Sequence, residues 1–208
     1  MKSLILILSA LVLCSCGSTS STTSACSGNS WTQTSAADAK SLNDSSGSGS
    51  TNYDRLAQTF RISSAAATVN LSSAALILSR TGSFTASTYT ATVEIQADAA
   101  GNSETQPSGT ALASASIDPA TQIAGNTEQT VTFTFTAPVT LTTATTYWLI
   151  FRADYPVSAT NFLKWSAYSG QSNYRSGQGY YRLSNIGTSF LNTNFGAALD
   201  FAFTLRGC

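Results

Sequence analysis

The chain has 208 residues, and its ten basic and ten acidic residues give a formal net charge of zero. This balance provides no basic field for nucleic acid, so nucleic acid is not an expected partner. The chain also contains no histidine, which removes the usual general base of Ser and Cys hydrolases and the commonest zinc ligand. We therefore expect a protein that is not an enzyme and that uses neither a cofactor nor a metal.

The first fifteen residues, 1–15, have the pattern of an export signal. Lys2 provides the positive start, and residues 4–13 form a short apolar run. A membrane-spanning helix needs about 20 apolar residues, so this run is too short to span a bilayer. We expect the segment to direct export and then to be removed.

The end of this segment, Leu13-Cys14-Ser15-Cys16, resembles the lipobox of bacterial lipoproteins. Leu13 and the small Ser15 stand before Cys16 as that motif requires, whereas Cys14 would place bulky Leu13 beside the cleaved bond. The resemblance implies lipidation of Cys16, and two apolar chains there would give stable membrane attachment. We expect anchoring at a bacterial cell envelope, in the outer membrane or on the cell surface. The alternative is an ordinary secretory signal in which the cysteine occurs by chance.

Residues 16–30 are rich in Ser, Thr and Gly and predict a flexible tether between the lipid and the domain. Once Cys14 is removed and Cys16 is lipidated, the remaining cysteines are Cys26 and Cys208. An even pair in an exported protein is most simply a disulfide, here one that ties the end of the chain to the start of the domain. Two free thiols are the alternative.

Alternation of apolar and polar residues predicts β-strands along the rest of the chain, which we take as one domain, residues 31–208. Val131, Phe133 and Phe135 alternate with threonines, a period of two that places the apolar side chains on one strand face. Pro138 cannot donate to a sheet, so we expect this strand to end there. Strands are expected within residues 31–36, 56–62, 75–80, 89–97, 111–117, 131–136, 147–151, 162–168, 179–184 and 198–205.

No amphipathic helix of useful length interrupts these strands, and turn-rich segments such as residues 98–110 separate them. About nine short strands in this arrangement predict an all-β fold, an antiparallel β-sandwich of jelly-roll type. Trp148 faces opposite Tyr147, Leu149 and Phe151 along one expected strand. One of the two faces of that strand must therefore be covered by something beyond the core of the sandwich.

Three segments resemble the bacterial surface domain called choice-of-anchor R: residues 56–60 (LAQTF), residues 106–113 (QPSGTALA) and residues 131–151. The resemblance covers roughly residues 53–206 and implies a jelly-roll module displayed on a bacterial surface. It implies no catalytic residues. Many relatives resemble substrates of C-terminal sorting, whereas this chain stops at Cys208, so we expect display to depend on the N-terminal lipid.

Acidic residues provide weak candidates for chemistry. Glycosidases need two carboxylates that face each other across a cleft, whereas Glu94 lies on an expected outward strand face and Glu104 and Glu128 lie in loops. We interpret these three as solvated surface acids. Asp98, Asn102 and Glu104 lack the spacing of an EF-hand calcium loop, so turn chemistry is favoured over a metal site.

Aromatic residues in the last third of the chain are the better candidates for binding. The predicted ligand-binding residues are Trp165, Tyr168, Tyr174, Tyr180 and Arg182. Flat apolar rings next to neutral hydrogen-bonding groups suit the CH faces and hydroxyls of a sugar. The alternative is that Trp165 belongs to the core and that the tyrosines cover strand edges.

The first functional hypothesis is therefore a non-enzymatic envelope lipoprotein whose β-sandwich serves adhesion or binding of a surface glycan or protein ligand. The second is a carbohydrate-binding module that uses the aromatic cluster. A distant third is a glycan-cleaving enzyme.

Overall fold

The computed structural model describes residues 29–33, 38–41, 53–83, 89–99, 106–154, 161–169, 177–183, 189–192 and 199–208. Cys16, Cys26 and Tyr174 lie outside these residues. The strands are β1 (Asn29–Gln33), β2 (Asp38–Ser41), β3 (Tyr53–Arg61), β4 (Thr68–Thr81), β5 (Thr90–Asp98), β6 (Pro107–Ile117), β7 (Gln129–Thr142), β8 (Thr146–Asp154), β9 (Phe162–Ser169), β10 (Gly179–Leu183), β11 (Leu191–Asn192), β12 (Leu199–Phe201) and β13 (Phe203–Gly207). The helix α1 (Pro119–Gln122) is a single turn between β6 and β7.

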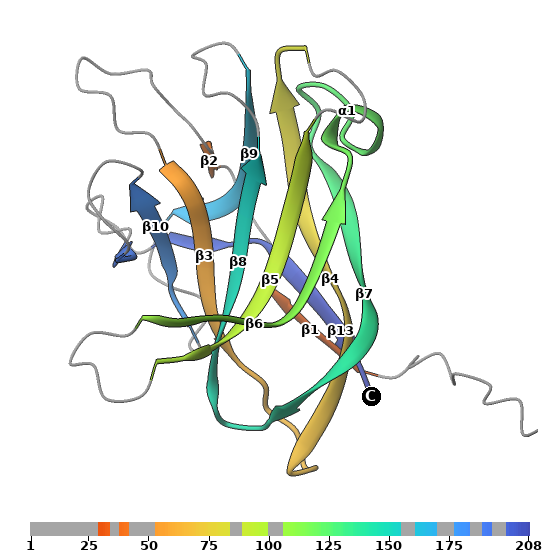
Figure 1. The fold of residues 1–208 in the computed structure, drawn as a ribbon, viewed down its shortest axis with the longest axis vertical. Helices are drawn as coiled ribbons and strands as arrows, with labels where there is room; N and C mark the ends of the chain where they lie inside the picture. Colours follow the sequence, from red (N-terminus) through yellow and green to blue (C-terminus); the bar gives the residue numbers. More distant parts are fainter. Residues whose placement is uncertain are drawn as a thin grey trace, which may run out of the picture.

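The strands form two antiparallel sheets that make a sandwich (Figure 1). The seven-stranded sheet contains β1-β13-β4-β7, and β9 also pairs with β4 and carries β2 and β12. The six-stranded sheet has the order β11-β10-β3-β8-β5-β6. The interleaved quartets β1-β13-β4-β7 and β3-β8-β5-β6 have the strand order of a jelly roll. The predicted fold class, an all-β antiparallel sandwich of jelly-roll type, is confirmed.

The core lies between the inner faces of the two sheets and is dominated by aromatic rings. Phe151 on β8 meets Phe133 on β7 and Trp165 on β9, with ring centroids 6.3 Å and 5.9 Å away in edge-to-face geometry. Trp165 also stacks on Phe201 at 4.5 Å. Each fully buried side chain of this kind stabilises the fold by roughly 1.5–3 kcal/mol, so these contacts between β8 of one sheet and β7 and β9 of the other hold the two layers together.

The prediction that the strand after Val131 ends at Pro138 is wrong, because β7 continues to Thr142. The register between β4 and β7 shifts here: Leu71 pairs with Val139, but Ser73 pairs with Thr134. Four residues of β7 therefore stand opposite one residue of β4. Pro138 lies in this bulge, where the ladder does not need its missing N–H.

Strands β4 and β6 also start well before the predicted residues. β4 starts at Thr68 instead of residue 75, and β6 starts at Pro107, inside the segment predicted as a connection. The last predicted strand is interrupted at Ala202, which separates β12 from β13. There the backbone N–H of Ala202 donates to the carbonyl of Ser166, and the carbonyl of Ala202 accepts from Trp165 Nε1 at 2.7 Å. The backbone and one side chain of β9 therefore provide the hydrogen-bond partners that a regular strand pairing would provide.

Candidate functional site

The outer face of the six-stranded sheet carries an unusual set of side chains for a solvent-facing surface. On β8 the residues Tyr147, Leu149 and Phe151 belong to the main core, so the alternate residues Trp148, Ile150 and Arg152 face outward. Trp148 nevertheless has an exposed fraction of 0%. The expectation that one face of this strand is covered by something beyond the sandwich core is confirmed.

Trp148 is buried in a second, smaller apolar cluster with Ala57, Ile150 and Phe190, and Tyr180 packs against this cluster. Ring centroids of Tyr180 and Phe190 lie 4.6 Å and 5.5 Å from that of Trp148. The indole Nε1 of Trp148 donates to Asp98 Oδ1 at 2.7 Å. This bond satisfies the polar end of a ring that is otherwise out of contact with water.

The segment that carries Phe190 is held in place by Gln106. The backbone N–H of Phe190 donates to Gln106 Oε1, and Gln106 Nε2 donates to the Phe190 carbonyl, both at 2.8 Å. This two-bond amide contact fixes Phe190 against the residue that immediately precedes β6. The segment that carries Phe190 therefore forms a wall over the outer face of the six-stranded sheet.

A cleft of about 440 Å³ lies beside this wall, within the size range of small-molecule sites, about 300–1,000 Å³. Its lining combines an apolar ring and an aliphatic side chain with amides, hydroxyls and two arginines. The lining residues are Arg55, Gln96, Gln106, Pro107, Ser108, Gly109, Ile150, Arg182, Ser189 and Phe190. This combination of apolar surface and convergent polar groups is typical of a binding site.

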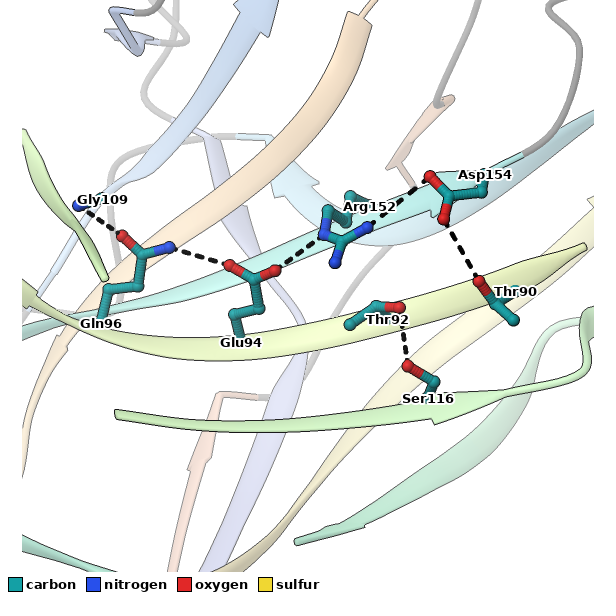
Figure 2. Close-up of polar contacts among 8 residues, drawn as sticks. All are labelled: Thr90, Thr92, Glu94, Gln96, Gly109, Ser116, Arg152 and Asp154. Atoms are coloured by element: carbon teal, nitrogen blue, oxygen red, sulfur yellow. Dashed lines mark hydrogen bonds and ion pairs between the residues drawn. The ribbon is translucent and has the colours of Figure 1, made fainter. Parts of the chain in front are cut away.

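A continuous chain of polar contacts runs along the outer face from the cleft to the far end of β8 (Figure 2). The backbone N–H of Gly109 donates to Gln96 Oε1 at 2.9 Å, and Gln96 Nε2 donates to Glu94 Oε2 at 2.8 Å. Arg152 Nε donates to Glu94 Oε1 at 2.7 Å, while its Nη1 lies 3.6 Å from Asp154 Oδ1. Both Glu94 carboxylate oxygens are thus bonded, which fixes the side chain.

The environment of Glu94 favours its ionised form. Burial raises the pKa of this carboxyl, but hydrogen bonds from Arg152 and Gln96 and the positive charges of Arg152 and Arg55 lower it by more. The net result is a pKa below the usual value. Glu94 is therefore a permanently charged structural partner of Arg152 at neutral pH and cannot act as a general acid there.

Tyr180 has the opposite shift. Burial against Trp148 and the negative charge of Asp98 both raise the pKa of its phenol above the usual value. Tyr180 therefore stays neutral throughout the physiological range. It offers an apolar ring to the cluster instead of a nucleophile or a base.

No protein family, curated protein or solved structure matches this chain. The resemblance to choice-of-anchor R domains accordingly stays a prediction. Among the described residues, no helix has the length and apolar character needed to span a membrane. In the same part of the chain, no group of three Asp, Glu or Cys side chains is arranged to hold a metal ion.

The four predicted ligand-binding residues that the structure describes, Trp165, Tyr168, Tyr180 and Arg182, do not form one surface, and Tyr174 lies outside the described residues. Trp165 has an exposed fraction of 0% and stacks on Phe201 in the main core, so its prediction as a ligand-binding residue is wrong, and the alternative that Trp165 belongs to the core is correct. The cause is its strand face, which it shares with buried Leu163. Tyr168 lies on β9, opposite Asp200 of β12, in the seven-stranded sheet.

Only Tyr180 and Arg182 of that set lie on β10 at the cleft side of the six-stranded sheet. Arg182 lines the cleft directly. Tyr180 packs against Trp148, which in turn packs against Phe190 of the cleft lining. The interpretation of Glu94 as a solvated surface acid is also wrong, because its exposed fraction is 9%. Glu128 is exposed and accepts a hydrogen bond from Ser166, whereas Glu104 lies outside the described residues.

Sequence reasoning missed most of the cleft, including Arg55, Gln96, Gln106 and Phe190. These residues come from β3, β5, the residue before β6 and the segment before β11, which only long-range pairing brings together. The sequence contained one signal: Trp148 lies on the strand face opposite to the core residues of β8, so another segment was needed to bury its ring. That requirement pointed to a second apolar layer without saying which segment supplies it.

Proposed function

We propose that this chain is a non-enzymatic lipoprotein of a bacterial cell envelope whose jelly-roll domain binds an extracellular ligand in the outer-face cleft. The observation that carries the proposal is the cleft itself: 440 Å³ of space walled by Phe190 and lined by amides, hydroxyls and arginines. The acid Glu94 is held by Arg152 and Gln96, an arrangement that supports a structural role for it. Binding is thus the better supported role for this face than hydrolysis.

A carbohydrate is the second, more specific candidate ligand. Phe190 lines the cleft with an apolar ring edge, while the exposed Ser108 and Ser189 offer neutral hydrogen-bonding groups beside it. A sugar ring presents CH groups and hydroxyls in the same alternation. The predicted platform built on Trp165 is thereby replaced by a site on the other sheet.

A glycan array tests this function with the full chain purified in detergent micelles. Ser189 is exposed and lines the cleft, so Ser189→Trp fills the space and should abolish binding. Ser63 is also exposed but lies outside the cleft, which makes Ser63→Trp a matched control that should bind like wild type. Equal binding by both variants would contradict the assignment of the cleft.

Attachment to the envelope is proposed through a lipid on Cys16, which the lipobox-like Leu13-Cys14-Ser15-Cys16 supports. Cys14 provides a matched control. Cys16→Ser should release the protein from the membrane fraction, whereas Cys14→Ser should leave it there. An unmodified residue at the mature N-terminus, found by mass spectrometry of the wild-type protein, would refute lipidation.

A further inference from the structure

Two strands at the margins of the sandwich, β6 and β7, each pair on one side only. Among the described strands, β7 pairs with β4 alone and β6 pairs with β5 alone. Each strand therefore has a row of backbone N–H and C=O groups that no described strand uses. The two strands lie next to each other, so both rows belong to the same side of the sandwich (Figure 1).

The other described strands at the margins of the two sheets are short or charged. β1 has five residues, β11 has two and β12 has three. β2 has four residues, and two of them are the charged Asp38 and Lys40. Short length and charged side chains are common protections of a sheet edge against pairing with another chain. These four strands are therefore poor templates for an additional strand.

β6 and β7 have neither of these protections. β6 has 11 residues and β7 has 14, and neither strand contains Asp, Glu, Lys or Arg. In the first half of β7, exposed threonines alternate with the buried Phe133 and Phe135. Residues of these β-branched and aromatic types favour strands. The first half of β7 is thus a regular, uncharged strand whose outer side can accept another strand.

The exposed side chains of β6 also suit burial against a second surface. Leu112 has an exposed fraction of 46% and is the large apolar side chain with high exposure among the described residues. Its neighbours from 108 to 116 are Ser, Gly, Thr and Ala, which are small enough to allow another backbone to approach closely. Covering Leu112 would remove apolar area from water, a favourable term for association.

We propose that two copies of this chain associate through the surface formed by β6 and β7, with residues 129–136 of β7 paired antiparallel to the same residues of the second copy. A two-fold axis places the same surface on both copies. Because β6 and β7 are uncharged, this surface can face itself without the repulsion that like charges opposite each other cause. The bulge at Pro138, which has no N–H to donate, ends the stretch that can pair.

The size of the surface fits a stable dimer. A standard protein interface takes about 20–30 residues from each partner, and β6 and β7 together supply a number within this range. The partner is a second copy because the same uncharged strand, with the same regular stretch, is then present on both sides of the new pairing. The sheet that ends at β7 would continue into the second copy.

The test measures the mass of the full chain in detergent micelles by sedimentation, at protein concentrations from about 1 μM to about 100 μM. Wild type should change from monomer to dimer within this range. Hydrogen exchange of the backbone amides in residues 129–136 should slow as the dimer forms, because new hydrogen bonds protect them. Residues 29–33 of β1, at the opposite margin of the same sheet, should exchange at the same rate in monomer and dimer.

Lysine variants decide whether β7 is responsible for association. Thr132 is exposed on β7, and Thr132→Lys should raise the dissociation constant of the dimer by at least about tenfold, because each copy then brings a positive charge to the pairing. Thr32 is exposed on β1, so Thr32→Lys is the matched control and should change the constant by less than about twofold. If Thr132→Lys does not fold, Thr134→Lys on the same exposed face of β7 provides the same test.

Three outcomes overturn the proposal. The first is a wild-type protein that stays monomeric over the whole concentration range. The second is equal dimer formation by Thr132→Lys and Thr32→Lys, which is also the result expected if two lipid anchors merely share one micelle. The third is a dimer in which the amides of residues 129–136 exchange as fast as in the monomer, since association would then use another surface.

Discussion

Gln58 and Asp200 meet across the interior of the sandwich, with Gln58 Nε2 donating to Asp200 Oδ1 at 3.2 Å and both residues at 0% exposure. Gln58 comes from β3 of one sheet and Asp200 from β12 of the other. The Gln58 amide also accepts from the backbone N–H of Phe201 at 2.7 Å. The Gln58 side chain therefore hydrogen-bonds both to the carboxylate of Asp200 and to the backbone at the end of the short strand β12.

Gln58→Ala should destabilise the fold strongly, because it leaves Asp200 without this donor and the Phe201 N–H without this acceptor in a buried site. Each buried group left without its partner costs about 1–3 kcal/mol, so the expected loss in free energy of unfolding is about 3 kcal/mol. Urea unfolding measures it. Gln122 is exposed on α1, and Gln122→Ala is the matched control, with an expected change below about 0.5 kcal/mol. A loss for Gln58→Ala no larger than the control would contradict this account.

The Glu94–Arg152 pair predicts a specific pH dependence. The pKa of Glu94 is lowered in the folded protein from a usual value of 4.5. Its contribution to stability is therefore present above that value and is lost as the pH falls through the folded pKa. Glu94→Gln should reduce the free energy of unfolding by about 1–2 kcal/mol at about pH 7, after allowance for the partly exposed Arg152.

At about pH 3, below the usual pKa of 4.5, the difference between wild type and Glu94→Gln should be smaller than at about pH 7, because the unfolded state then binds a proton that the folded state binds less readily. Denaturant unfolding at both pH values provides the measurement. Glu128→Gln removes an exposed carboxylate outside this polar chain and should stay close to wild type at the higher pH. A difference between wild type and Glu94→Gln that is constant with pH would show that the charge of Glu94 does not stabilise the fold.

The strands of this protein were easier to predict than its cleft, and the reason is physical. Alternation in residues 89–97 or 131–135 is a local pattern with period two, and the structure places strands over both. The prediction that the strand ends at Pro138 is wrong because Pro138 lies in a bulge, and this bulge depends on the pairing with β4. Arg182, Arg55 and Arg152 stand opposite one another only through the registers of β10, β3 and β8, and no local pattern contains that information.

The aromatic cluster shows a second limit of local reasoning. Trp165 and Tyr180 lie only fifteen positions apart in the sequence, yet β9 and β10 belong to different sheets. Rings that are close in sequence therefore pack on opposite layers, one in the main core and one over Trp148. Their proximity along the chain led to the prediction of a shared surface, because the sequence does not show that β9 and β10 belong to different sheets.

Ala144 is a position where substitution should stabilise the protein. It lies in the turn between β7 and β8 with a φ of 60°, a left-handed conformation that is unfavourable for residues with a Cβ. Ala144→Gly should raise the free energy of unfolding by about 1 kcal/mol. The midpoint of thermal unfolding measures the gain. Ala66 is exposed and has no such φ, so Ala66→Gly should be neutral or destabilising, and a similar gain in both variants would exclude relief of strain as the cause.

The paired ends of the chain support the predicted disulfide between Cys26 and Cys208. β1 pairs with β13 so that Asn29 is opposite Gly207, next to Cys208, and Cys26 precedes Asn29 by three positions. Cys208 is itself tied to β4 by two backbone hydrogen bonds with Asn70, at 2.7 Å and 3.0 Å. Because closure of so long a loop contributes up to about 5 kcal/mol, Cys208→Ala should lower the free energy of unfolding by as much as that, and Cys26→Ala should do the same. The double variant should be no less stable than either single variant, because all three lack the same bond. Additive losses in the double variant, or alkylation of both thiols in the unreduced, denatured protein, would show that the bond does not form.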